Sequence, residues 1–172
     1  IEEPWILVLD NSGVVKEVSI LEVFQDSHNF VRLAGELATQ DLSILRLLLA
    51  IMHSVYGRSN AILGFSDTMI TEEDALARWK KLWDLKSIPI SNIETYLTIY
   101  ADRFYLFHPK YPFYQVADLT KGTSYSGSNL NGELSESNNK LRLFPNRNGC
   151  EKNILNYSEA ARWLLHVNNF DD

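Results

Sequence analysis

Residues 40–56 read QDLSILRLLLAIMHSVY, and this stretch decides the fold. Its apolar residues recur at helical spacing, with Leu42, Leu45, Leu48, Leu49 and Met52 on one stripe and Ile44, Leu47 and Ile51 widening it. A helix that is apolar around most of its circumference is buried on most sides. We therefore expect this helix, capped by Thr39 and ended by Gly57, to lie at the centre of the core.

The residues before this helix predict a small β-structure. Two β-rich runs, residues 5–9 and 14–18, flank the turn formers at 10–13 and indicate a β-hairpin. Ser19 with Glu22 three positions later is a capping-box signature, so a short helix should run to about Gln25.

Three further helices are expected after it. Thr71 with Asp74 predicts one that carries Leu76, Trp79, Leu82 and Trp83, of which we expect Trp79 and Trp83 to pack in the core. Ser91 with Glu94 predicts another, and Ser158 should cap a last one over residues 159–167. Residues 104–115 are aromatic and carry Pro109 and Pro112, which forbid a regular helix, so we expect extended chain laid on the core.

The segment at 121–149 differs in composition from the rest. Thirteen of the twenty residues at 121–140 are Gly, Ser, Thr or Asn, a composition that buries little apolar surface. We predict a long flexible loop there. The fold class is therefore a mixed α/β (α+β) domain, mostly helical, with a small N-terminal β-hairpin or sheet on a helical core.

Charge and composition exclude several classes of protein. The chain has 172 residues, a net charge of -6, 45% hydrophobic residues and one cysteine, Cys150. Binding nucleic acid by overall charge typically requires a basic domain, so any such contact must be local. One cysteine excludes an internal disulfide and a cysteine-cluster zinc site. The longest apolar run is too short to span a membrane, and we expect a cytoplasmic protein.

No sharp catalytic motif is present, and we assign no catalytic residue, metal ligand or cofactor. The four histidines are scattered, and we expect His53 and His166 to be packed and His108 to be a turn residue. A hydrolase that uses His108 or His166 with a nearby carboxylate is the weaker alternative. Cys150 has no histidine near it in sequence and is interpreted as an inert thiol.

One segment, residues 138–152, has the composition of a nucleic-acid contact. It carries Lys140, Arg142, Arg147 and Lys152 against Glu151 alone. Phe144 can stack on an unpaired base and asparagine can bind a base edge, while the basic residues can meet phosphate. The rival interpretation is a protein-only interaction module, whose loop docks a partner subunit without touching RNA.

Several blocks in order resemble one family, the CasA family of large subunits of the type I-E CRISPR Cascade. The blocks are Glu3-Pro4-Trp5-Ile6 before the hairpin, and residues 18–24, 32–37, 102–109, 112–115 and 158–165. The resemblance covers most of the chain. It implies that residues 1–172 are the N-terminal domain of a longer protein.

The resemblance also implies a function. Members of this family are non-catalytic subunits of an RNA-guided surveillance complex, with CRISPR RNA, target double-stranded DNA, other Cascade subunits and a recruited helicase–nuclease as partners. A Phe-x-Asn element that reaches the 5′ handle of the RNA or the adjacent subunit would fall on Phe144, Pro145 and Asn146. Lys140, Arg142 and Arg147 would contact phosphate. The glycine-rich loop that approaches the target-flanking motif would lie beyond Asp172.

Overall fold

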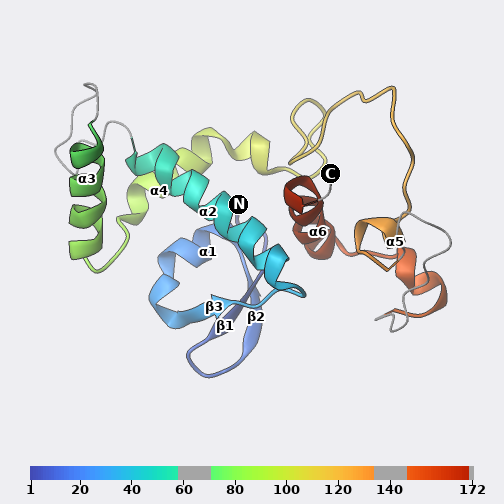
Figure 1. Ribbon diagram of the computed structural model, residues 1–172, viewed down its shortest axis with the longest axis horizontal. Coiled ribbons are helices and arrows are strands. Elements are labelled where there is room, and N and C mark those ends of the chain that lie inside the picture. Colours follow the sequence, from blue (N-terminus) through green and yellow to red (C-terminus); the bar gives the residue numbers. More distant parts are fainter. Residues whose placement is uncertain (58–70, 134–146, 171–172) are drawn as a thin grey trace.

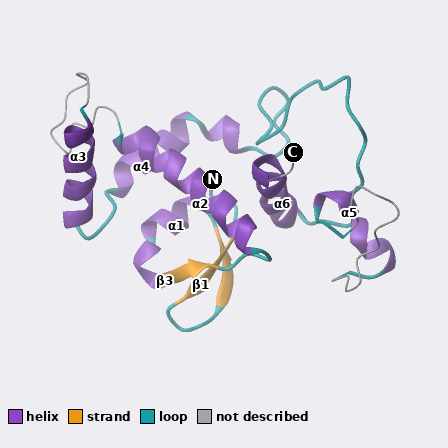
Figure 2. Ribbon diagram, viewed as in Figure 1, coloured by secondary structure: helices purple, strands orange, loops and turns teal. Residues whose placement is uncertain are grey.

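The computed structural model describes residues 1–57, 71–133 and 147–170. It is a mostly helical α+β fold, as predicted, in which a small sheet lies beneath the long helix α2 (Figures 1 and 2). Helix α3 lies at one end of the molecule and α5 at the other, while α2, α4 and α6 lie between them (Figure 1). In the described part of the chain, no helix is long and apolar enough to cross a membrane.

The N-terminal sheet has three antiparallel strands in the order β2-β1-β3, with β1 at Ile6–Asp10, β2 at Val15–Val18 and β3 at Phe30–Leu33. The predicted hairpin is confirmed, with Ile6 opposite Val18. Asp10 closes its turn, because one carboxylate oxygen accepts the Ser12 and Val14 amides and the Ser12 hydroxyl. Strand β3 was not predicted from the sequence.

Helix α1, Ile20–Gln25, begins at the predicted capping box: the Ser19 hydroxyl accepts the Glu22 amide, and the Glu22 carboxylate accepts the Ser19 amide. Ile20 and Phe24 are buried beneath it. A 3₁₀ turn, η1 at Ser27–Asn29, then leads the chain into β3. The predicted capping chemistry thus places α1 against the core.

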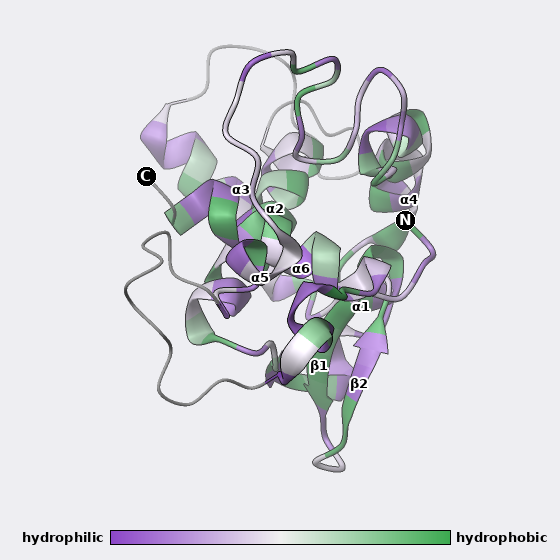
Figure 3. Ribbon diagram, turned by 90° about the vertical axis from the view of Figure 1, so that its right-hand side faces the viewer, coloured by the Kyte–Doolittle hydropathy of each residue, from purple (hydrophilic) through white to green (hydrophobic). Residues whose placement is uncertain are grey.

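Helix α2, Ala38–Tyr56, is the central helix and packs against both α4, Ile90–Ile99, and α6, Tyr157–Phe170. Its inner face is buried and consists of Ile44, Leu47, Leu48 and Ile51. The expectation that it is buried on most sides is wrong, because Leu42, Leu45 and Leu49 are each more than 40% exposed. In Figure 3 the helices carry both hydrophobic and hydrophilic bands, whereas β1 is mainly hydrophobic.

Three helices start at residues other than the predicted caps. Leu37, not Thr39, precedes α2, because Thr39 already lies within the helix and its hydroxyl lies 2.9 Å from Nε2 of His166. Helix α4 starts after Pro89, one residue before Ser91. At α6 the side chain of Asn156, not that of Ser158, accepts the Glu159 amide, and the Ser158 hydroxyl donates to the Pro4 carbonyl.

Helix α3, Glu72–Asp84, has the predicted capping box between Thr71 and Asp74. Leu82 is buried, and the Trp79 ring packs against the exposed His53 at a centroid distance of 4.8 Å. The expectation that Trp83 packs in the core is wrong, since Trp83 is 77% exposed; Leu76 is 64% exposed as well. Leu76 and Trp83 are seven residues apart, about two turns, and so lie on the same side of α3.

Residues 105–126 form no regular helix after the 3₁₀ turn η2 at Ala101–Phe104, as the prolines predicted, but the expected extended chain is wrong, because residues 105–115 run through successive turns and bends. Phe113 is buried, with its ring centroid 5.9 Å from that of Trp5, and the partly buried Phe104 and Leu106 also pack against the core. Most of the other aromatic side chains here are exposed, so the segment touches the core at few points.

The predicted loop at 121–149 contains a short helix, α5 at Gly127–Leu130, that composition did not reveal.

Candidate nucleic-acid interface

The predicted site residues divide into two groups. Lys140, Arg142, Phe144, Pro145 and Asn146 lie at positions 134–146, outside the described residues. Arg147 is described, as are the two stretches of chain that flank 134–146. The structure therefore describes the two stretches of chain that flank the candidate interface, and we call these its base.

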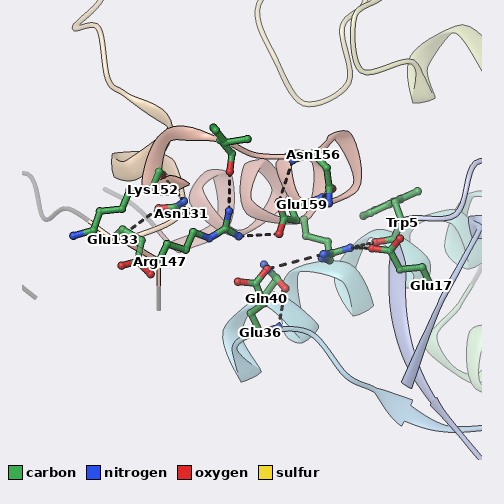
Figure 4. Close-up of polar contacts among 12 residues, drawn as sticks. Trp5, Glu17, Glu36, Gln40, Asn131, Glu133, Arg147, Lys152, Asn156 and Glu159 are labelled. Carbon is green, nitrogen blue, oxygen red and sulfur yellow. Dashed lines mark hydrogen bonds and ion pairs between the residues drawn. The ribbon is translucent and has the colours of Figure 1, made fainter. Parts of the chain in front are cut away.

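The base is formed by α5 on one side and the 3₁₀ turn η3, Gly149–Asn153, on the other. The Ser128 amide donates to the Asn153 side-chain carbonyl at 3.1 Å, and the Asn131 side-chain amide donates to the Lys152 carbonyl at 3.0 Å. Ser128 and Asn131 are almost fully buried. We call this pair of elements the α5–η3 clamp, and Figure 4 shows the contact between Asn131 and Lys152.

The clamp needs a glycine at its closest point. A Cβ atom on Gly127 would lie 2.7 Å from the Asn153 carbonyl oxygen, a distance that real Cβ contacts do not show. Only a residue without a Cβ lets the two backbones approach this closely. Gly127 is therefore needed for close packing, whereas composition alone suggests that it only makes the segment flexible.

Hydrogen bonds within residues 126–133 also stabilise the α5 side of the clamp. Ser126 and Asn129 form a capping box at the start of α5, and the Asn131 side chain accepts the Glu133 amide at 3.1 Å. Glu133 itself is only 3% exposed. Position 133, the last described residue before the candidate loop residues, is thus held by buried hydrogen bonds.

Arg147 fixes the other side. Its guanidinium donates to the Ile154 carbonyl at 2.8 Å and to one carboxylate oxygen of Glu159 at 2.8 Å (Figure 4). The second Glu159 oxygen accepts the Asn156 amide at 3.0 Å. The Arg147 and Glu159 side chains are about one-fifth exposed, so the charge predicted to meet phosphate is compensated by a carboxylate in this conformation.

A second arginine ties α6 to the N-terminal sheet. Arg162 is 4% exposed and donates to the Trp5 carbonyl at 2.8 Å and to the Glu17 carboxylate at 2.7 Å. Glu36 lies 4.0 Å from the same guanidinium. A buried arginine is stable only when its charge is compensated, and these contacts do that. Helix α6, which holds Glu159, is therefore fixed to the rest of the fold.

Sequence reasoning missed Gly127, Asn153, Glu159 and Arg162. Two local signals were present: Asn156 precedes Glu159 by three residues, and Ser126 precedes Asn129 by three, both at capping-box spacing. The contacts of Arg162 join residues more than 140 positions apart, and no local pattern encodes them.

The histidines of the alternative hydrolase are engaged in packing. His108 accepts the Tyr111 amide on Nδ1 at 2.9 Å, which is the predicted turn role, and its ring stacks on that of Tyr111. His166 contacts the Trp163 and Phe170 rings as well as Thr39. Within residues 1–57, 71–133 and 147–170, no group of three or more His, Cys, Asp or Glu side chains could hold a metal ion.

Comparison with known proteins gives one consistent result. A family model described as CRISPR-associated protein Cse1 matches residues 1–171. The CRISPR-associated protein CasA/Cse1 of Thermus thermophilus is 36% identical over 167 residues, which cover 96% of this chain and 30% of that protein. The crystal structure of Thermobifida fusca Cse1 is similar with a TM-score of 0.70 and 34% identity, over 97% of this chain and 29% of that one.

A chain of a CRISPR RNA-guided surveillance complex in a pre-nicking state has the same fold, with a TM-score of 0.76 at 18% identity over 96% of this chain. The chain thus spans about 30% of the length of the relatives that it matches.

Proposed function

This chain belongs to the CRISPR-associated Cse1 family, and from that membership we propose that it acts as the N-terminal part of the large subunit of an RNA-guided DNA surveillance complex. The match over residues 1–171 is the observation that carries this proposal. In this role the chain does no chemistry. It assembles with CRISPR RNA and the other Cascade subunits in the cytoplasm and takes part in recognising target double-stranded DNA.

The contact with RNA is assigned to the loop between the two halves of the α5–η3 clamp. Phe144 is the stacking or packing anchor, Asn146 is the polar contact, and Pro145 lies between them. Lys140 and Arg142 meet phosphate. Base–aromatic stacking tolerates different sequences because every base has a π-face, which suits an RNA handle bound beside a protein subunit.

The clamp supports this assignment in physical terms. Binding through a loop costs conformational entropy, and a loop whose two ends are already fixed loses less on binding. Ser128 and Asn131 hold one end, and Arg147 holds the other.

The charge distribution supports it as well. With a net charge of -6, the chain as a whole repels phosphate, while residues 138–152 carry a local excess of positive charge. A subunit that sits in one place in a ribonucleoprotein needs only such a local contact. A strongly basic surface would bind any nucleic acid, with a steep dependence on salt.

Recruitment of a helicase–nuclease and recognition of the target-flanking motif belong to the same proposal for the whole protein. In the full-length subunit, we assign motif reading to residues beyond 172. Residues 1–172 alone should therefore bind duplex DNA weakly and cleave nothing.

The proposal is tested by purifying the full-length protein with its associated subunits and footprinting the bound RNA. We expect a short CRISPR RNA to copurify and its 5′ handle to be protected when the subunit is present. Protection that is identical with and without the subunit would favour the protein-only interaction module. Metal-dependent cleavage of DNA that one substitution at His108 or His166 abolishes would instead favour the hydrolase.

A further inference from the structure

The outer face of α2 is apolar and exposed, although α2 is the central helix of the fold. Leu42, Leu45 and Leu49 are 47%, 44% and 43% exposed. Arg46 is the only charged residue between the first and the last of them. When one face of a helix is exposed to solvent, that face normally carries charged and polar residues. Arg46 and the exposed His53 lie beside this row of leucines, and the row itself is apolar.

The spacing of the leucines indicates which kind of secondary structure could pack on them. Leu42, Leu45, Leu49 and the half-buried Met52 follow one another at intervals of three, four and three residues. This is the a/d spacing of a heptad, in which the side chains of one helix insert between those of another. A second helix that lies along α2 at a shallow angle matches such a seam better than a loop or strand does.

We infer that an amphipathic α-helix of the full-length chain, from outside residues 1–172, packs along the Leu42–Leu45–Leu49 seam of α2. Its relatives are about three times as long as this chain, so a partner element from the same polypeptide is available. The described elements do not fill that place, because α4 and α6 pack on α2 and still leave the three leucines exposed.

A second copy of the chain fits the seam less well. Three half-exposed leucines offer much less than the roughly 1,000 Å² that an independent interface needs. An element of the same chain docks without the loss of translational and rotational freedom that a separate molecule incurs.

The inference does not depend on the RNA contact, and it is tested on the full-length protein. Leu45→Cys and Leu49→Cys are made in a background in which Cys150 and other exposed cysteines are serine, and the rate of maleimide alkylation is measured. Val14→Cys, at a position 55% exposed on the hairpin, is the matched control. A photo-crosslinking residue at position 45 identifies the segment that lies against it.

We expect Leu45→Cys and Leu49→Cys to react at least about tenfold more slowly than Val14→Cys in the monomeric full-length protein, because alkylation then requires local opening. The crosslinked peptide should come from the same chain, outside residues 1–172. Alkylation as fast as that of the control overturns the inference. So does protection that appears only on dimerisation, only in the assembled complex, or with a crosslink to another subunit.

Discussion

The Arg147 guanidinium donates a 2.8 Å hydrogen bond to the Glu159 carboxylate and thereby links the end of the candidate RNA-binding segment to the first turn of α6. The partner is a carboxylate, so the guanidinium that was predicted to meet phosphate is already paired. Either Arg147 exchanges Glu159 for phosphate when RNA binds, or it remains the strut that positions the loop.

Two substitutions separate these roles. Glu159→Gln removes the charge of the partner and frees the guanidinium, whereas Arg147→Ala removes the guanidinium itself. If Arg147 is the strut, both variants lower retention of the subunit on the RNA and share a coupling free energy of about 0.2–1 kcal/mol in a double-mutant cycle. Subunit retention and thermal unfolding are measured for each variant. We expect the strut, because Arg147 also binds the Ile154 carbonyl.

Gly127→Ala should disrupt the α5–η3 clamp. The added Cβ would lie 2.7 Å from a backbone carbonyl that cannot turn aside, so we expect a destabilisation of about 1–3 kcal/mol. Gly122→Ala is the matched control, since its Cβ would meet only a Leu119 methyl group at 3.5 Å. Thermal unfolding and amide exchange at residues 149–153 are measured. Equal behaviour of the two variants would contradict the clamp.

The hairpin turn at Asp10 should show a pH dependence. Hydrogen bonds from the Ser12 hydroxyl, and then from the Val14 amide, lower the pKa of the Asp10 carboxyl from 3.8 to about 2. Because the pKa is lower in the folded state, the carboxylate stabilises the turn fully above pH 3.8, and this contribution is lost as the pH falls through about 2. An NMR titration of the Asp10 carboxyl measures this.

Removal of the hydrogen bond from the Ser12 hydroxyl to the Asp10 carboxylate is the control for that titration. In Ser12→Ala, the pKa of Asp10 should move back towards its ordinary value, because the hydroxyl no longer donates to the carboxylate. An unchanged Asp10 pKa in this variant would show that another group sets it.

Leu82 and Trp83 are neighbours in sequence but should differ sharply in their effect on stability. Leu82 is 7% exposed, so Leu82→Ala should lower the free energy of unfolding by about 2–5 kcal/mol. Trp83 is 77% exposed, so Trp83→Ala should change it by no more than about 0.5 kcal/mol despite the larger side chain. Chemical denaturation of both variants compares them, and a reversed order would contradict the packing of α3.

The sequence was informative where structure is local. The capping boxes at Ser19 and Thr71 and the hairpin at 10–13 depend on residues within four positions of one another, and all three are confirmed. The caps assigned to Thr39, Ser91 and Ser158 are wrong because each helix starts two residues earlier than those caps imply, at Ala38, Ile90 and Tyr157. Leu37 and Pro89, which precede α2 and α4, form no side-chain cap hydrogen bond, so the preference of polar residues for the cap position does not locate these two helix starts.

Burial was harder to predict than helix formation. Periodicity shows that a helix has apolar faces but not which of them meets the rest of this chain, so Leu42 and Trp83 were assigned to the core and are exposed. The same limit explains α5, whose polar residues are buried by hydrogen bonds to η3 and not by apolar packing. Arg162 was missed because its partners lie at the other end of the sequence.

The central claim is that Phe144 and Asn146 hold the subunit in the ribonucleoprotein, and the occupancy of the full-length subunit in the purified complex tests it most directly. Phe144→Ala should cost about 1–3 kcal/mol if the ring stacks on a base. Asn146→Ala should cost about 0.5–1.5 kcal/mol, and Phe144→Tyr, which keeps the ring, should cost little.

We predict that the double variant Phe144→Ala/Asn146→Ala loses occupancy while its melting temperature stays unchanged, because we assign the two side chains to binding and not to the core. Normal occupancy of the double variant would contradict the assignment of the loop. A large fall in melting temperature would instead show that Phe144 belongs to the core.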